Sequence, residues 1–155
     1  MRCRQITRSS GQCGLNGWGV EKNISKGINL QIKAAKQGFS KAQFLLGGNY
    51  AFGTSIAVDY DKALKWLKLA SEQGHTDSQF VLSQMYGFGK GMKVDLIKAH
   101  MWSQINALNK NQNMNMHFSQ GEKLRKQWEK KMTPAQIADA QKLARECVRK
   151  KYKGC

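Results

Sequence analysis

The chain has 155 residues, of which 41% are hydrophobic and 23% charged, enough apolar material for the core of one domain of moderate size. Its formal net charge is +16, and no apolar run reaches the length of about 18 residues that favours a membrane-spanning helix. Four cysteines are too few for a disulfide scaffold, and they form no Cys-x-x-Cys pair that would favour a zinc site: Cys3, Cys13, Cys147 and Cys155.

The start of the chain, 1–13, has arginines but no apolar stretch behind them, so it is not typical of a secretory signal. The chain as written is therefore expected in the cytoplasm. A start that is truncated inside a repeat would instead allow a periplasmic or secreted protein. Residues 14–34 align with the second half of the repeat described next, with Gly17 in the place of Gly53, and form a partial copy of it.

The central feature of the sequence is an internal repeat of 36 residues. The segments 35–70 and 71–106 align without a gap, and their identical pairs include Gln43/Gln79, Phe44/Phe80, Leu46/Leu82, Tyr50/Tyr86, Phe52/Phe88 and Trp66/Trp102. A unit of this length cannot bury its apolar faces alone, so neighbouring copies are expected to stack into a solenoid.

The first helix of each copy is expected at 40–52 and at 76–88. Each begins at a pattern that predicts a capping box, formed by Ser40 with Gln43 and by Thr76 with Gln79. A buried stripe follows at four-residue spacing, and it consists of Ala42, Leu46 and Tyr50 in the first copy. A glycine then ends each helix, Gly53 or Gly89.

The second helix of each copy is expected at 60–73 and at 96–108, with Asp59 and Asp95 as the N-capping residues. The buried stripe of the first of these helices consists of Ala63, Leu67 and Ala70, and Gly74 ends it. His75 follows that glycine, where a cation would suit the dipole at the end of the helix.

The tail, 107–155, is predicted to cap the solenoid. An asparagine-rich stretch is expected to form a loop, and a helix is expected at 116–131 with one face made of His117, Gly121, Leu124, Trp128 and Met132. The Thr-Pro-x-Gln pattern at Thr133 then starts a last helix at 134–150, whose apolar face consists of Ile137, Ala140, Ala144, Cys147 and Val148. Its other face is basic, as the outer face of a terminal element has to be polar.

These residues resemble the Sel-one-like repeat (SLR) family, relatives of the tetratricopeptide repeats. The first copy carries the family pattern as Ala42, Leu46, Gly47, Tyr50, Gly53, Asp59, Lys62, Ala63, Trp66, Ala70 and Gly74. The second copy carries it as Leu82, Tyr86, Gly89, Asp95, Lys98, Ala99 and Trp102, with Ser78 and Ser83 in place of two small residues. The resemblance implies an all-α, α/α solenoid with C-terminal capping helices, and a protein-interaction scaffold rather than an enzyme.

The resemblance also implies where a partner protein or peptide would bind. Tetratricopeptide repeats line their concave face with the first helix of each repeat. By register, that face is formed by Lys41, Phe44, Gly48 and Phe52 in the first copy and by Asp77, Phe80, Gln84 and Phe88 in the second. Four phenylalanines would then line one groove. The alternative interpretation is that Phe44 and Phe80 pack between the copies.

Other functions have weaker support. Cysteine-rich bacterial members of the family have been linked to β-lactamase or penicillin-binding behaviour, but Ser40, Ser71 and Ser83 have no evident catalytic partner in the sequence. In such members a spacing similar to that of Cys147 and Cys155 supports a disulfide; two separate thiols are the alternative. The basic tail would attract nucleic acid, but aromatic residues for base stacking, such as Tyr152, are sparse there. No metal or cofactor site is predicted.

Overall fold

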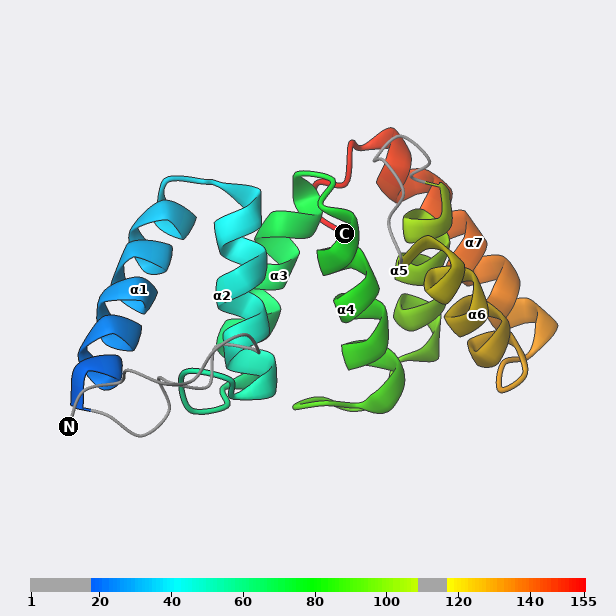
Figure 1. Cartoon of the computed structure of the whole chain (residues 1–155). Helices are drawn as coiled ribbons and strands as arrows, with labels where there is room; N and C mark the ends of the chain where they lie inside the picture. Colours follow the sequence, from blue (N-terminus) through cyan, green and yellow to red (C-terminus); the bar gives the residue numbers. More distant parts are fainter. Residues whose placement is uncertain (1–17, 109–116) are drawn as a thin grey trace.

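The computed structural model describes residues 18–108 and 117–155, and in that part of the chain it contains seven α-helices and no strand. The helices alternate in direction and stack as hairpins into one curved array (Figure 1). They are α1 (Trp18–Lys36), α2 (Ser40–Phe52), α3 (Tyr60–Glu72), α4 (Thr76–Phe88), α5 (Leu96–Leu108), α6 (His117–Glu129) and α7 (Pro134–Arg149). The predicted all-α solenoid is therefore confirmed.

Some expectations concern residues outside the described part of the chain. These are the non-repeat segment 1–13, the beginning of the partial copy at 14–34 and most of the asparagine-rich loop. Among the described helices, none is long and apolar enough to cross a membrane.

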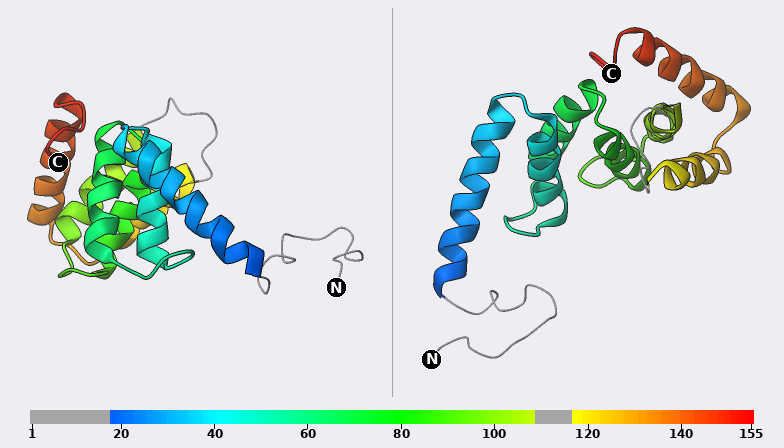
Figure 2. Two further views of the ribbon diagram at one scale, coloured as in Figure 1. Left: turned by 90° about the vertical axis from the view of Figure 1, so that its left-hand side faces the viewer. Right: turned by 45° about the horizontal axis from the view of Figure 1, so that its top comes forward.

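The helices pack as hairpins, α2 against α3 and α4 against α5. In the right-hand view of Figure 2 they follow an arc, with α1 at one end and α6 and α7 at the other. The tail closes the solenoid as predicted, because α6 packs against α4 and α5 while α7 packs against α5.

The core lies between the helices of the two full copies. Leu46 and Leu82 are fully buried, and so are the residues of the predicted stripe on α3, Ala63, Leu67 and Ala70. The two repeat tryptophans differ, since Trp102 is buried whereas Trp66 is only partly buried. The difference arises because more helices pack against α5, which carries Trp102, than against α3, which carries Trp66. Helix α5 contacts α4, α6 and α7, whereas the main neighbours of α3 are only α2 and α4.

The predicted capping boxes at the starts of α2 and α4 are wrong. Ser40 and Thr76 are themselves the first helical residues, so the N-capping residues are Phe39 and His75. The glutamines instead bridge helices. Gln43 Nε2 donates to the Ala35 carbonyl at 3.1 Å, and Gln79 Nε2 makes the equivalent bond to the Ser71 carbonyl at 3.5 Å. Both carbonyls lie at the end of a helix, where backbone acceptors have no partner within the helix.

The other predicted caps are present. The Asp59 side chain accepts from the Lys62 amide at 3.0 Å, and Asp95 does the same for Lys98 at 2.9 Å. Thr133 forms the complete capping box with Gln136. Short polar side chains thus cap the starts of α3, α5 and α7.

His75 does not act as a cation at the end of α3. Its Nδ1 accepts from the Ser78 amide at 3.4 Å, and its ring stacks on Phe44 with the centroids 4.8 Å apart. Burial lowers the pKa of His75, and Lys41 lowers it further, although Asp77 acts in the opposite direction. A neutral ring is the form that can accept a hydrogen bond at the positive end of α4.

The C-terminal residues return to the middle of the array. A disulfide joins Cys147 to Cys155, and the Gly154 amide donates to Glu72 Oε1 at 3.3 Å. The expected apolar face of α7 is buried at Ala140, Ala144 and Cys147, whereas Val148 is 39% exposed. Val148 follows Ala144 by four residues, so the helical turn places it at the edge of this face.

Candidate partner-binding surface

The four residues of α2 predicted to bind a partner form a row along the helix, and the apolar part of this row is exposed only at its C-terminal end. Lys41 is exposed, but Phe44 is partly buried under the ring of His75. A Cβ placed on Gly48 would meet no atom within 4 Å, and Phe52 is 53% exposed. Only the end of the row near the first turn therefore offers apolar surface to a partner.

The equivalent row in α4 is likewise open at its C-terminal end and closed at its N-terminal end. Asp77 and Gln84 are partly exposed and Phe88 is 50% exposed, whereas Phe80 is only 8% exposed. Phe80 belongs to the hydrophobic core, together with Leu124 of α6. A groove lined by four phenylalanines is thus corrected to two exposed phenylalanines, because the first halves of both rows are closed by packing.

Two valines extend this surface, and the sequence interpretation missed them. Val58 and Val94 are 50% and 57% exposed, and each comes just before the aspartate that caps the second helix. A Cβ on Gly53 would lie 2.8 Å from Val58, and the same approach recurs between Gly89 and Val94 at 2.9 Å. Both glycines also adopt the left-handed conformation, at φ +64 and +65. The signal was available, since the two valines occupy equivalent positions of the repeat.

These residues form one surface, which we call the turn edge and define as Gly48, Phe52, Val58, Gln84, Phe88 and Val94. An exposed Phe and Val pair occurs twice on it, once at the end of α2 and once at the end of α4. Both phenylalanines also contact neighbouring side chains. The Lys90 ammonium lies 5.4 Å from the Phe52 ring centroid, and Phe88 packs edge-to-face on Trp128 with the ring centroids 5.1 Å apart.

The charges beside the turn edge are mostly paired. Lys62 Nζ lies 2.7 Å from Asp59 Oδ2, and hydrogen bonding to Lys62 holds the pKa of Asp59 below its usual value. The Lys62 ammonium also lies over the Tyr50 ring, at 5.4 Å. The second copy repeats the arrangement with Asp95, Lys98 and Tyr86. The Tyr, Asp and Lys residues of the repeat pattern therefore stabilise the turn between the two helices of each copy.

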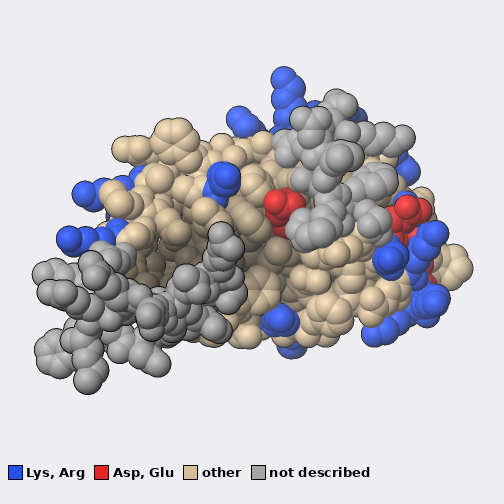
Figure 3. Space-filling model, in the orientation of Figure 1, with Lys and Arg blue, Asp and Glu red and all other residues tan. Residues whose placement is uncertain are grey.

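The face that contains α2 and α4 carries few charges over most of the area that the structure describes. In Figure 3 lysine and arginine side chains gather at its margins, and acidic side chains are few. Such a surface is suited to contacts through apolar and neutral groups rather than through charge.

The serines considered for catalysis have structural roles. Ser71 and Ser83 are fully buried, and their hydroxyls donate to the carbonyls of Leu67 and Ala99. Ser40 is the first residue of α2. Likewise, His100 is buried and its Nε2 lies 2.9 Å from Glu129 Oε1, which ties α5 to α6. In the part of the chain that the structure describes, no three His, Cys, Asp or Glu side chains gather as metal ligands.

Comparison with known proteins identifies the repeat. A family model described as the Sel1 repeat matches residues 10–39, 40–75 and 76–105. The chain belongs to the Sel1 repeat family. The second of these Sel1 repeats contains α2 and α3, and the third contains α4 and most of α5. The first contains α1, and it begins upstream of the partial copy that sequence periodicity indicated.

Solved Sel1-type structures share the fold. One is a protective antigen present in uropathogenic Escherichia coli strains, with an SLR fold; it is 29% identical over 85% of this chain, with a TM-score of 0.75. Another is a Sel1 repeat protein from Oxalobacter formigenes, 42% identical over 56% of this chain, with a TM-score of 0.50. The present chain covers 28% and 25% of those two chains. No curated protein matches it.

Proposed function

We propose that this Sel1 repeat chain is a scaffold that binds a segment of another protein along the turn edge. The observation that carries the proposal is the repetition of half-exposed Phe and Val side chains, Phe52 with Val58 and Phe88 with Val94, at equivalent positions of successive repeats. Exposed apolar groups that recur in register offer a partner two equal anchoring points. Scattered single side chains would not do so.

The energetics are consistent with a peptide ligand. Complete burial of a phenylalanine side chain contributes roughly 1.5–3 kcal/mol, so covering the exposed halves of Phe52 and Phe88 would contribute about 1 kcal/mol each. Two valines add to this. Such a sum supports only weak binding, in the millimolar range, as expected of a scaffold whose partner exchanges.

The polar members of the predicted row would set the limits of the site. Lys41 and Asp77 lie at the closed ends of the two rows, near the starts of α2 and α4. A partner that lies across the turn edge would contact Gly48 and Gln84 before it reached them. Gly48 would let a partner backbone approach α2 closely, since no Cβ stands there.

Selection from a displayed peptide library tests this proposal. Peptides are selected on the wild-type protein alone, and the affinity of each selected peptide is then measured for the double variant Phe52→Ser, Phe88→Ser. We expect apolar peptides that bind the wild type and lose at least about tenfold in affinity for the double variant. The control is Phe39→Ser, because Phe39 is 61% exposed at the start of α2, the opposite end from Phe52. Selected peptides that bind all three proteins equally would rule out the turn edge.

A further inference from the structure

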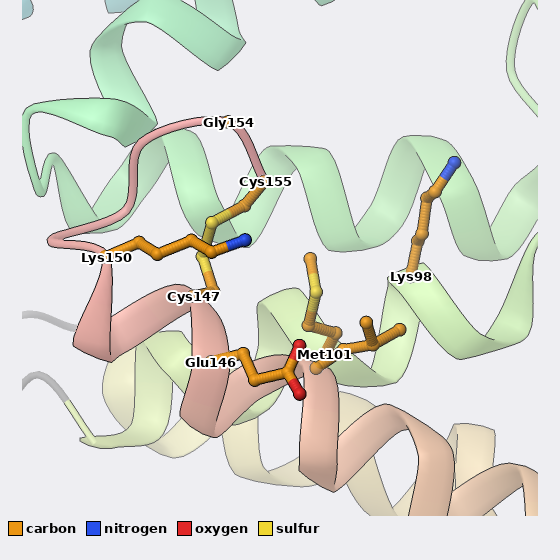
Figure 4. A pocket seen from close by; sticks show the side chains of 8 residues that line it. Lys98, Met101, Glu146, Cys147, Lys150, Gly154 and Cys155 are labelled. Carbon is orange, nitrogen blue, oxygen red and sulfur yellow. A yellow bond between two sulfur atoms is a disulfide. The ribbon is translucent and has the colours of Figure 1, made fainter.

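A small hollow lies beside the C-terminal disulfide (Figure 4). Its volume is about 120 Å³, and its apolar wall consists of Met101 of α5, Leu143 of α7 and the bonded pair Cys147 and Cys155. An apolar cavity only slightly larger than this can accept benzene. The hollow therefore has room for one branched apolar side chain.

Basic side chains surround the hollow. Lys98 and Lys150 line it together with one carboxylate, Glu146. In Figure 4 the Lys150 ammonium ends beside the disulfide, and Lys98 extends from the other side of Met101. Because Lys98 already pairs with Asp95 at 3.5 Å, Lys150 is the more available of these two cations.

The positive charge continues along α7. A shallow depression next to the hollow shares Glu146 and is otherwise lined by Lys142, Arg145 and Arg149. The two concavities together present five basic side chains and one acidic side chain. A partner that covers both would need to be acidic, with an apolar group at the position of the hollow.

We propose that the hollow and the adjacent face of α7 bind an acidic peptide segment that carries one leucine-like side chain. The side chain would enter the wall formed by Met101, Leu143 and the disulfide, and flanking carboxylates would face Lys150 and the basic residues of α7. This site shares no residue with the turn edge, so it is independent of the function proposed above.

The shape of the site favours a peptide over nucleic acid or a membrane. Single-stranded nucleic acid binds through aromatic side chains on which bases stack, and none lines the hollow. Tyr152 follows α7, but its ring lies against Gly74, where an added Cβ would be 3.4 Å from Tyr152 Cε2. A bilayer surface requires a projecting apolar face, whereas the apolar atoms here form a concave wall.

The disulfide gives the site a defined wall. Cys155 is held by its bond to Cys147 and by the neighbouring hydrogen bond from Gly154 to Glu72. Cys155→Ser would leave the charges of α7 in place while releasing part of the apolar wall. It should therefore reduce the preference for an apolar side chain more than it reduces the attraction for carboxylates.

Fluorescence anisotropy with two labelled hexapeptides tests the proposal. Each peptide contains glutamates around one central residue, which is leucine in the first and alanine in the second. We expect the leucine peptide to bind about tenfold more tightly, because three additional carbon atoms are buried. Lys150→Gln should weaken its binding about two- to fivefold, and Glu146→Gln should strengthen it by a similar factor.

Charge-matched controls separate a site from general attraction to a basic protein. Lys33→Gln removes the same charge from α1, far along the array, and should leave the affinity nearly unchanged; so should the turn-edge variant Phe52→Ser, Phe88→Ser. Equal binding of the leucine and alanine peptides, or equal losses for Lys150→Gln and Lys33→Gln, would overturn the proposal. It would also be overturned if a single-stranded oligonucleotide or anionic vesicles bound more tightly than the peptide and displaced it.

Discussion

The position of Trp128 predicts that one type of substitution has opposite effects at two glycines. Gly87 of α4 lies directly against the buried indole, since a Cβ on it would stand 2.4 Å from Trp128 Cζ2. Carbon atoms in contact are about 3.5 Å apart, so the ring would have to move by about 1 Å. At Gly48 of α2, an added Cβ would meet no atom within 4 Å.

The magnitudes follow from these distances. Overpacking costs roughly 1–3 kcal/mol, and a displaced ring also weakens the hydrogen bond from Trp128 Nε1 to Ser83 Oγ, which is 3.2 Å long and contributes about 1 kcal/mol. Alanine in place of a helical glycine stabilises either variant by about 1 kcal/mol. We therefore expect Gly87→Ala to lower the free energy of unfolding by about 1–3 kcal/mol, and Gly48→Ala to raise it by up to about 1 kcal/mol.

Urea denaturation followed by far-UV circular dichroism measures both free energies, with the wild type as reference. The signs are the decisive result, because both variants add the same methyl group to an equivalent kind of backbone. If Gly87→Ala were as stable as the wild type, or if both variants were stabilised, the indole would not fill the space above α4. The account of how α6 caps the solenoid would then be wrong.

Four further outcomes are expected. Leu82→Ala should lower the free energy of unfolding by roughly 2–5 kcal/mol in urea titrations, because Leu82 is fully buried; no loss would contradict its core position. In calorimetry, Phe80→Ala should lower the thermal midpoint by several degrees, whereas Phe52→Ala should leave it nearly unchanged. Because burial lowers the pKa of His75, the stability that its neutral ring provides is present above about pH 6.5 and is lost as the pH falls through the folded-state pKa. His75→Asn keeps a capping side chain without titrating, so its urea midpoint should fall less between neutral pH and about pH 5; an equal fall would refute this role. The protein should not hydrolyse nitrocefin above a heat-denatured control, and turnover that one serine substitution abolishes would show that it is an enzyme.

The helices were predictable because the repeat supplied each boundary twice. The expected ranges 40–52, 76–88 and 96–108 agree with α2, α4 and α5 at both ends. Two copies in one register remove most of the ambiguity that a single amphipathic segment would leave. The glycines after α2 and α4 gave correct ends for the same reason.

The errors arose where a local pattern competed with a contact between helices. Gln43 and Gln79 matched a capping box in sequence, but their side chains reach the carbonyls at the end of the preceding helix. Phe80 is buried in a core to which α6 contributes, and no pattern within the repeat reports that contact. His75 was interpreted as following one helix, whereas it caps the next.

The candidate surface was only half predictable. Register alone placed Phe52 and Phe88 in equivalent positions, which the structure places at the open ends of their rows. Val58 and Val94 lie in turns, where helical periodicity gives no information about exposure. The hollow beside Cys147 and Cys155 depends on how the residues after α7 fold back, which sequence spacing does not specify.

Site-specific photo-crosslinking tests the central claim most directly. Benzoylphenylalanine is introduced in place of Phe52, Phe88 or Phe39, and each protein is irradiated with a peptide selected on the wild type. All three positions are at least half exposed, so each should accept the label. If the turn edge binds the partner, positions 52 and 88 will crosslink and position 39 will not. Crosslinking from position 39 alone, or from none of the three while the peptide remains bound, would contradict the account.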